Sequence, residues 1–352
     1  MVEPWFERMT MLRTVSFLLV CLCLFVWSCG HSNRQGTTAP LSSAEIGETV
    51  YTFKENNMVR GLYLSDNDQI AALRLQEPFF SIIDVKTRSL QSSYGRKGRA
   101  SGELLDVPFG VNYRDGELQF FSFATKSMVF FSVPDGRFRS EKVPYHVSFR
   151  PTRAVEINGS IIATGGLEQG RVAMVDADQH VSSIADYPFD TGDVSGIYRG
   201  GLFQSDIFVA PTLPRFVVRT LASDCFEIYE IDETGVKRVF VNNFKSPPVL
   251  EDRRIKPKKC VAGYIRVYVD DEHIYLMTAA GSYQDASNAG LLSDVIHKYD
   301  WRGNFEGVIK LPEKVGPFCI RDSVLFGAIE YPDRSEIRMY VCGQDLEKPA
   351  TQ

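Results

Sequence analysis

Short apolar and aromatic runs alternate with polar turn residues along the chain from Glu48 onward. No stretch of helical length keeps apolar residues at positions i, i+3, i+4 and i+7, which is the spacing of an amphipathic helix. Runs of β-branched and aromatic residues bounded by Gly, Asp and Asn are typical of strands and tight turns. The pattern therefore predicts an all-β domain.

A four-strand cassette recurs within this domain. Each copy has a strand, a polar turn, a second strand, a variable loop, a third strand, another polar turn and a fourth strand. The first turn returns at residues 66–68, 115–116, 158–159, 270–272 and 321–322. These turns are rich in Asp, Asn and Gly, which accept the positive φ angles of two-residue hairpins. Six copies align, at a period of roughly forty to seventy residues.

A repeated four-stranded unit predicts a six-bladed β-propeller with four-stranded antiparallel blades. Each twisted blade buries its apolar faces on its neighbours, and a ring leaves only short edges exposed. The strand at residues 47–53, GETVYTF, precedes the first cassette, and we expect it to pair with the last blade and close the ring. The alternative is a pair of β-sandwiches, which would not require the turns to recur in phase.

The N-terminal segment has the features of a secretory signal peptide. Residues 14–28, TVSFLLVCLCLFVWS, carry no charge, and Arg8 and Arg13 supply a positive flank. The apolar run is shorter than the roughly 20 residues that a membrane-spanning helix needs. It ends in VWSC, which resembles the lipobox of bacterial lipoproteins, although Trp27 stands where a small residue is usual. The sequence thus predicts lipid attachment at Cys29; the alternative is an ordinary signal peptide or short anchor helix with an incidental cysteine.

These features divide the chain into four parts. They are a lipoprotein signal peptide at 1–28, a flexible tether at 29–46, the propeller at 47–346 and a disordered tail at 347–352. The tether sequence is polar and poor in apolar residues, as expected between an anchor and a folded body. We therefore expect the domain to be lipid-anchored to a membrane of the bacterial cell envelope, facing the periplasm or the cell surface.

Part of the body carries a family resemblance. In residues 94–133, Gly95, Gly98 and Glu103 fit a GxxGxxxxE run, while residues 100–101 are Ala-Ser where Gly-Pro is frequent. This stretch is similar to the inter-blade segment and second blade of the TolB-like six-bladed propeller lipoproteins of Bacteroidetes.

The closing third of the chain resembles the same family. Residues 264–340 contain its IYLMTAA strand, a polar loop and a final blade, and the DWRGN turn at 300–304 is the most specific element. The resemblance implies a propeller fold and an envelope location, and it implies no particular activity.

The overall charge argues against one class of partner. The formal net charge is -5 at pH 7, whereas a nucleic-acid binder needs a concentrated excess of Lys and Arg over its binding face. We expect no nucleic-acid partner and a monomeric protein.

One insert between the fourth and fifth cassettes is strongly basic. The segment NNFKSPPVLEDRRIKPKKC contains Lys245 and a cluster formed by Arg253, Arg254, Lys256, Lys258 and Lys259. We expect this basic loop to meet an acidic partner, such as a polysaccharide, a phospholipid head group or an acidic envelope protein. The alternative is a solvated linker that its prolines keep extended, which requires no ligand.

Other chemistry-bearing residues form no catalytic or metal-binding pattern, so we predict no cofactor and no metal. There is no GxSxG motif, and we expect His146, His180, His273 and His297 to be half-buried or surface imidazoles. The carboxylates at 66–68, 176–178 and 270–272 have the oxygen chemistry of a calcium site, but turn formation is the simpler role.

Four cysteines fall in the folded part, and their spacing is wide and irregular: Cys225, Cys260, Cys319 and Cys342. Without a CxxC pair they do not suggest zinc. We expect free or partly buried thiols, and one disulfide stays open because an exported protein can be oxidised.

The sequence favours a membrane-anchored, non-enzymatic binding or interaction module of unknown ligand. The alternative is a glycan-active hydrolase or lyase, which needs carboxylates or a histidine facing the central channel from the first strands of several blades. A deep axial pocket lined by charged and aromatic side chains would favour the enzyme, and a plugged channel would favour the binder.

Overall fold

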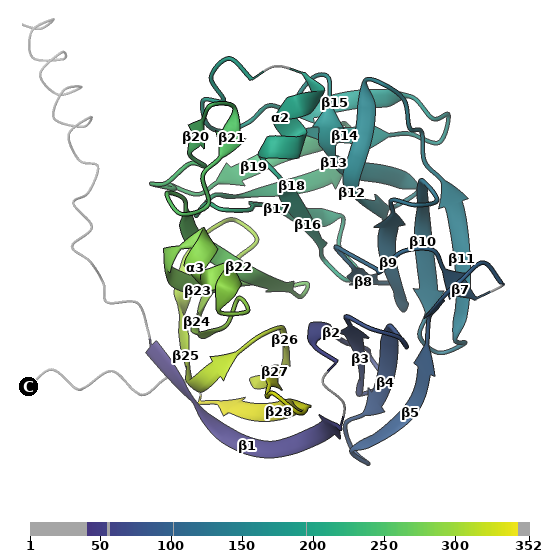
Figure 1. Cartoon of the computed structure of the whole chain (residues 1–352), viewed down its shortest axis with the longest axis vertical. Coiled ribbons are helices and arrows are strands. Elements are labelled where there is room, and N and C mark those ends of the chain that lie inside the picture. Colours follow the sequence, from purple (N-terminus) through teal and green to yellow (C-terminus); the bar gives the residue numbers. More distant parts are fainter. Residues whose placement is uncertain (1–40, 55–56, 101, 195, 344–352) are drawn as a thin grey trace, which may run out of the picture. The chain divides into compact units, whose positions relative to one another are not determined.

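The computed structural model describes residues 41–54, 57–100, 102–194 and 196–343 of the 352-residue chain (Figure 1). Cys29, the signal peptide, most of the predicted tether and the predicted tail lie outside these residues.

Four separate four-stranded antiparallel sheets follow one another along the described chain. The first holds β2 (Val59–Leu64), β3 (Gln69–Arg74), β4 (Phe80–Asp84) and β5 (Ser89–Tyr94), and the second holds β8 (Asn112–Arg114), β9 (Glu117–Ser122), β10 (Ser127–Ser132) and β11 (Arg137–Lys142). The third holds β12 (Phe149–Ile157), β13 (Ser160–Leu167), β14 (Val172–Val175) and β15 (Val181–Ala185), and the fourth holds β16 (Ser205–Val209), β17 (Arg215–Thr220), β18 (Phe226–Asp232) and β19 (Gly235–Val241).

An eight-stranded sheet completes the arrangement. One half is β22 (Val261–Val269), β23 (His273–Ser282), β24 (Ser293–Asp300) and β25 (Phe305–Val315), and the other is β1 (Leu41–Phe53), β28 (Ser335–Cys342), β27 (Val324–Glu330) and β26 (Phe318–Arg321). The two halves meet where residues 41–43 of β1 pair in parallel with residues 308–310 of β25. Counting this sheet as two blades gives the six blades that the sequence predicts, and that count stays a prediction.

The N-terminal strand closes the ring, as predicted. β1 pairs antiparallel with β28 from Ala44 opposite Cys342 to Phe53 opposite Ser335. It begins at Leu41, earlier than the residue 47 at which the apolar pattern starts, so the last residues of the predicted tether are part of a strand. The polar residues at its start are compatible with a strand because most of them lie at an exposed position of the sheet.

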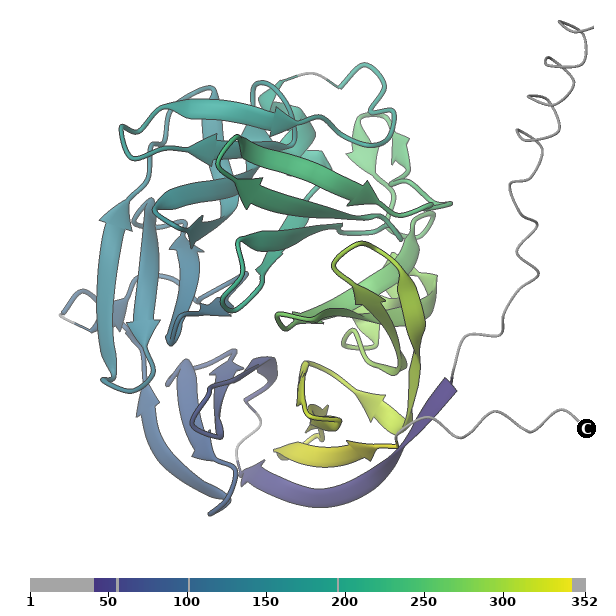
Figure 2. The ribbon, with the colours of Figure 1, turned by 180° about the vertical axis from the view of Figure 1, so that it is seen from behind.

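The sheets stand around a common axis, with the first strand of each cassette nearest to it (Figures 1 and 2). The core lies between successive sheets rather than within one layer. In β3, Ile70 and Ala72 face one hydrophobic cluster while Ala71 and Leu73 face the next, because side chains of a strand alternate between its two faces. This arrangement is a β-propeller, so the all-β propeller prediction is confirmed and the alternative of two β-sandwiches is wrong.

Four of the five first-type polar turns have the predicted positive φ, and the turn at 270–272 does not. Asp68, Asp115, Asn158 and Asp322 have φ angles between 49° and 56°, a region that Asp and Asn tolerate better than other non-glycine residues. The second type of turn is stabilised similarly at 300–304, where the Asp300 carboxylate accepts hydrogen bonds from backbone N–H groups. The turn sequences therefore set where each hairpin reverses.

The segments that carried the family resemblance have structural roles here. β6 (Arg96–Lys97) pairs in parallel with β7 (Glu103–Leu104), and the Glu103 carboxylate accepts a 2.8 Å hydrogen bond from the Ala100 N–H. Trp301 is buried, and its Nε1–H donates to the Asp270 carbonyl at 3.0 Å. Both elements link parts of the propeller.

Two short helices, which the sequence analysis did not predict, lie in the connections between strands. They are α2 (Ile197–Leu202) and α3 (Tyr283–Asn288), and both lie on the face of the ring turned toward the viewer in Figure 1. α2 sits very close to β13, since a Cβ on Gly200 would overlap the Gly165 carbonyl oxygen. In the described part of the chain, no helix has the length and apolar content needed to cross a membrane.

Candidate functional site

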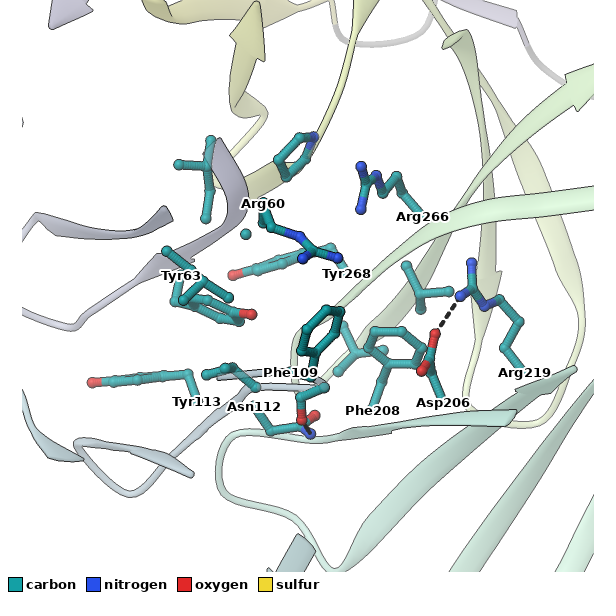
Figure 3. Close-up of a pocket in the computed structure, with 18 of the residues that line it drawn as sticks. Arg60, Tyr63, Phe109, Asn112, Tyr113, Asp206, Phe208, Arg219, Arg266 and Tyr268 are labelled. Atoms are coloured by element: carbon teal, nitrogen blue, oxygen red, sulfur yellow. Dashed lines mark hydrogen bonds and ion pairs between the residues drawn. The ribbon is translucent and has the colours of Figure 1, made fainter. Parts of the chain in front are cut away.

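A cavity of about 300 Å³ lies among the inner strands of the ring (Figure 3). Residues from β2, β8, β12, β16, β22 and their flanking segments line it, so several sheets contribute their first strand. The charged side chains in this lining are four arginines and one aspartate: Arg60, Arg153, Arg219, Arg266 and Asp206. The lining thus has an excess of positive charge in a protein whose net charge is negative.

Asp206 neutralises part of this charge. Arg153 Nε lies 2.8 Å from one carboxylate oxygen of Asp206, and Arg219 forms an ion pair with the other. Burial alone would raise the pKa of Asp206, but the two guanidinium groups outweigh it and hold that pKa below its usual range. Asp206 is therefore ionised at neutral pH and committed to its two arginines.

Arg60 and Arg266 have no ion pair with any described residue. The Arg60 guanidinium carbon lies 4.1 Å from the centroid of the Phe109 ring, and the buried Nε of Arg266 has no hydrogen-bond partner among the described residues. Burial, followed by repulsion from Arg219 and Arg60, lowers the pKa of Arg266 to about 10. It stays protonated at neutral pH, so two unneutralised cations face the cavity.

Aromatic rings form much of the remaining wall. Figure 3 shows Tyr63, Tyr268, Phe109 and Phe208 around the space that Arg60 enters. Burial raises the pKa of Tyr63 and of Tyr268, so both phenols are neutral. The cavity therefore combines flat apolar surfaces with fixed positive charge.

Hydrogen bonds between two inner strands hold part of the cavity wall together. The Asn112 side chain donates to the Ile207 carbonyl at 3.1 Å and accepts from the Val209 N–H at 3.0 Å. These bonds join β8 of the second sheet to β16 of the fourth, although the third sheet stands between them in the ring. The inner strands therefore converge at this level.

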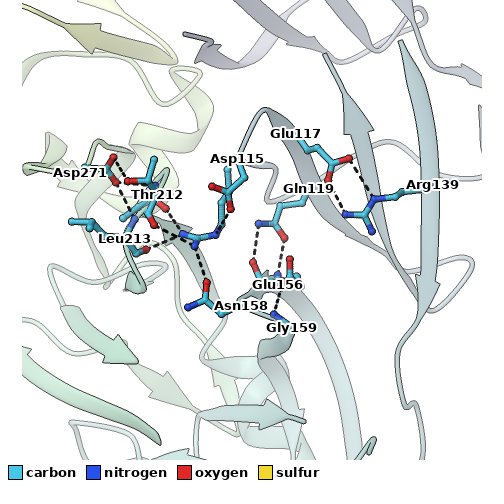
Figure 4. Close-up of polar contacts among 12 residues, drawn as sticks. Asp115, Glu117, Gln119, Arg139, Glu156, Asn158, Gly159, Thr212, Leu213 and Asp271 are labelled. Carbon is cyan, nitrogen blue, oxygen red and sulfur yellow. Dashed lines mark hydrogen bonds and ion pairs between the residues drawn. The ribbon is translucent and has the colours of Figure 1, made fainter. Parts of the chain in front are cut away.

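The turns beyond these strands are linked to one another as well. Buried Arg114 donates to the carbonyls of Ala210 and Leu213, each at 2.8 Å, and to the Asn158 side chain at 3.1 Å. Asp271, from the turn after β22, accepts hydrogen bonds from the backbone N–H groups at 212 and 213 (Figure 4). α2, which directly precedes β16, and α3 lie on the opposite face of the ring.

The predicted basic loop lies on that opposite face as a small hairpin. β20 (Leu250–Glu251) pairs with β21 (Arg254–Ile255), and the turn residues Asp252 and Arg253 both have positive φ. The interpretation of this segment as an extended linker is wrong, because positive φ angles at both central residues fold it back. Among its basic side chains, Lys259 pairs with Glu251, whereas Arg253, Arg254, Lys256 and Lys258 have no ion pair with a described residue.

The hairpin adjoins the rim of the cavity. The Cys260 carbonyl accepts a 2.8 Å hydrogen bond from the N–H of Tyr283, which lines the cavity, and the Pro257 carbonyl accepts one from Gln284. α3 thus connects the basic hairpin to the axial site. The two features, one predicted and one not, belong to the same face.

In two of the predicted acidic turns, one carboxylate binds backbone groups of its own loop. Asp176 accepts hydrogen bonds at 2.9 Å from the N–H groups of Asp178 and His180, and Asp270 accepts from Glu272 and His273. No group of three or more His, Cys, Asp or Glu side chains among the described residues is arranged to hold a metal ion.

The four cysteines of the propeller are buried free thiols, as expected. Burial raises the pKa of Cys225 and of Cys342 to about 11, so these thiols are protonated and unreactive at neutral pH. The disulfide that the sequence left open is not formed.

None of the four described histidines lines the cavity, but His297 gives the fold a pH dependence. It lies half-buried between Tyr264 and Phe305, its Nδ1 lacks a partner among the described residues, and burial lowers its pKa from 6.5. The unfolded chain therefore binds a proton more readily than the folded one. The stability that neutral His297 contributes is present above pH 6.5 and is lost as the pH falls below it.

We expect His297→Phe to flatten this dependence. Between pH 7.5 and 5, the free energy of unfolding measured in urea should fall less in the variant than in the parent. The difference between the two slopes should be at most about 1.4 kcal/mol per pH unit, the value for one proton. His180→Phe is the control, because the His180 side chain is 80% exposed. Equal slopes in the parent and both variants would contradict the assignment.

The cavity arginines were not recognised from the sequence. Each interrupts an apolar strand, as in VRGLYL and YIRVYV, and a single charge at such a position reads as a solvent-facing residue of an edge or outer strand. The sequence signal that could identify such arginines is a charged residue in the first strand of a cassette rather than in the fourth. This signal can be interpreted only when it is known that first strands face the axis.

Comparison with known proteins supports the fold. No family model and no curated protein matches the chain. A solved Bacteroides fragilis protein described as exported superposes with a TM-score of 0.53 at 11% identity, covering 84% of this chain and 94% of that chain. The propeller domain of Myceliophteria thermophila Cps50 (Swd1) superposes with a TM-score of 0.48 at 11% identity, covering 85% of this chain and 99% of that chain. Agrobacterium tumefaciens regucalcin, a calcium-binding protein, superposes with a TM-score of 0.47 at 10% identity, covering 87% of this chain and 98% of that chain.

Proposed function

We propose that this chain is an envelope-anchored β-propeller that binds a small anionic ligand in its axial cavity. The observation that carries the proposal is the pair of arginines, Arg60 and Arg266, that face the cavity without a carboxylate partner among the described residues. Holding unneutralised guanidinium groups close together in a partly buried site costs free energy. A carboxylate, sulfate or phosphate in the cavity would offset that cost and accept their hydrogen bonds.

Anion binding should depend on Arg266. Full-length protein in detergent is titrated calorimetrically with sulfate, inorganic phosphate and D-glucuronate, and at least one anion is expected to bind. Arg266→Met should weaken that binding by at least about tenfold, because a charge-assisted hydrogen bond contributes roughly 1.5–3 kcal/mol. Arg215→Met is the matched control, since Arg215 pairs with Glu230 on β17 and β18 and does not line the cavity.

The ligand-free protein offers an independent readout. Without anions, Arg266→Met should unfold at the same or a higher temperature than the parent, because the substitution removes a buried, unpaired charge. A loss of stability together with unchanged anion affinity would overturn the proposal.

The membrane anchor is part of the proposal and rests on the sequence alone. The VWSC stretch and the uncharged run before it support acylation of Cys29. We expect Cys29→Ser to abolish incorporation of labelled palmitate and to move the protein from the membrane fraction to the soluble fraction. Unchanged labelling would contradict the anchor without affecting the cavity.

The resemblance to TolB-like propeller lipoproteins supports the same location. The exported Bacteroides fragilis protein shares the fold with this chain at low identity. We therefore extend the proposal to that family and to a six-bladed ring.

A glycan-active enzyme is the second candidate, because the axis holds a cavity with charged and aromatic walls rather than a fully plugged channel. A two-carboxylate hydrolase does not fit well, since Asp206 is the one carboxylate in the lining and is held ionised by two arginines. A lyase would use arginines to neutralise a uronate carboxylate, but the raised pKa of Tyr63 disfavours that phenol as a base. Release of unsaturated product from oligouronates, followed by ultraviolet absorbance, would establish the enzyme.

A further inference from the structure

We propose that the axial cavity and the basic hairpin together bind one acidic oligosaccharide, with its terminal acidic sugar in the cavity. This inference rests on the proposed function and adds the ligand class and the direction in which the ligand lies. Three observations support it: the walls of the cavity, the contacts between inner strands at one end of it and the position of the hairpin.

The walls suit a sugar ring that carries an acidic group. Tyr63, Phe109, Phe208 and Tyr268 present flat apolar surfaces, on which the C–H face of a pyranose ring can be buried. Arg266 supplies the fork of donors that a carboxylate or sulfate accepts. A volume of about 300 Å³ is at the small end of ligand sites, which suits one sugar residue rather than several.

The contacts at one end of the inner strands favour one direction for a longer chain. Asn112 and Arg114 tie the second sheet to the fourth at this end, away from the face that carries the hairpin. In the proposal, the end of a chain enters the cavity and the following residues leave through the mouth beside the hairpin. The site is therefore expected to recognise chain termini.

The basic hairpin lies beside the path of the emerging chain. Arg253, Arg254 and Lys258 are exposed and have no ion pair with a described residue, and the hairpin is joined to the cavity rim through Tyr283. A row of cations next to a cationic pocket matches a ligand that repeats its negative charge. An anionic phospholipid fits less well, because its acyl chains would have to leave through this charged mouth.

The test compares ligands of increasing length. Full-length protein in detergent is titrated with D-galacturonate and with its dimer and tetramer, at low and at physiological salt. We expect the tetramer to bind at least about tenfold more tightly than the monomer, with a steeper dependence on salt, because more charges are paired.

Two charge-reversed variants locate the second contact. Arg253→Glu/Arg254→Glu/Lys258→Glu should lower the affinity for the tetramer at least about tenfold and leave the affinity for the monomer within about twofold. Arg137→Glu/Lys237→Glu is the control; it reverses exposed charges on the outermost strands β11 and β19 and should change neither. Circular dichroism verifies that both variants are folded.

The outcomes separate the two proposals. Equal affinities for monomer and tetramer, with no effect of the hairpin variant, would overturn the oligosaccharide and leave the anion site standing. Binding of sulfate or phosphate without any sugar would do the same. Tetramer binding that is unaffected by Arg266→Met would overturn the oligosaccharide proposal alone, and binding of no anion at all would overturn both.

Discussion

Glu227→Gln is expected to lower the free energy of unfolding by about 3–5 kcal/mol, because it leaves a buried arginine without its counter-charge. Arg171 Nη1 lies 2.5 Å from Glu227 Oε2, and the two side chains are 1% and 0% exposed. Burial alone would lower the pKa of Arg171, but Glu227 more than reverses this and raises it, so the guanidinium is charged. Removing the carboxylate therefore strands a cation in the core.

The pair also holds two sheets together. Arg171 directly precedes β14 of the third sheet, while Glu227 is on β18 of the fourth. Arg171 further donates to Thr220 Oγ1 at 2.6 Å, and Glu227 accepts from Tyr229 and Arg238 at 2.9 Å. Loss of the Glu227 carboxylate should therefore lower the free energy of unfolding of the whole ring, rather than loosen a single strand locally.

Urea unfolding at neutral pH, followed by circular dichroism, measures the effect. Glu230→Gln on the same strand is the matched control: its ion pair with Arg215 is more than a third exposed, and we expect less than about 1 kcal/mol. The double variant Arg171→Met/Glu227→Leu should recover much of the stability, because it leaves no unpaired charge in the core. Arg238, which also pairs with Glu227, is 31% exposed and keeps its hydrogen bond to the Asp186 carbonyl. Equal losses for Glu227→Gln and Glu230→Gln would contradict a structural role for the buried pair.

The sequence predicts those parts of the fold that local chemistry decides. Turn residues such as Asp115 and Asn158 adopt the conformations that their side chains favour, and they mark the cassettes in phase. The pairing of the N-terminal strand with the last cassette followed from the need to close a ring. Strand order and turn position can therefore be predicted from the amino-acid pattern alone.

The candidate site is harder to predict because it depends on distance from the axis. The sequence does not show that Arg60 and Arg266, which lie in the first and fifth sheets of the ring, face the same space. The link between the second and fourth sheets is equally non-local, since it comes from Asn112 reaching a strand two sheets away. Only the basic hairpin could be located from the sequence, because a local excess of charge needs no tertiary information.

Position in the ring also explains why the histidines and acidic turns proved uninformative about function. His180 and Asp176 lie in the turn between the third and fourth strands of the third sheet, and these strands are farther from the axis than the first strand. Asp271 lies in a turn near the axis, and its carboxylate binds backbone N–H groups of the neighbouring sheet. In a propeller, the same residue type therefore has different consequences in the first and last strands of a sheet.

Deleting residues 41–53 is expected to abolish cooperative folding of the propeller. β1 supplies the strand that pairs with β28 along almost its whole length and the short parallel contact with β25. Its loss would expose an unpaired edge and the hydrophobic cluster that Val50 and Phe53 share with β2 and β27. No other described strand lies where it could cover those surfaces, so the deletion should give no unfolding transition and should bind a dye for exposed apolar surface.

Point variants keep this prediction testable if the deletion cannot be purified. Phe53 is 5% exposed, and Phe53→Ala should cost about 3–5 kcal/mol in urea unfolding, whereas Ile46→Ala on the same strand, at 53% exposed, should change stability by less than about 0.5 kcal/mol. A peptide of residues 41–54 added to the deleted protein should restore part of the native circular dichroism signal, because the strand completes the sheet from outside. A deleted protein that unfolds at the parental urea concentration would show that the ring closes without β1.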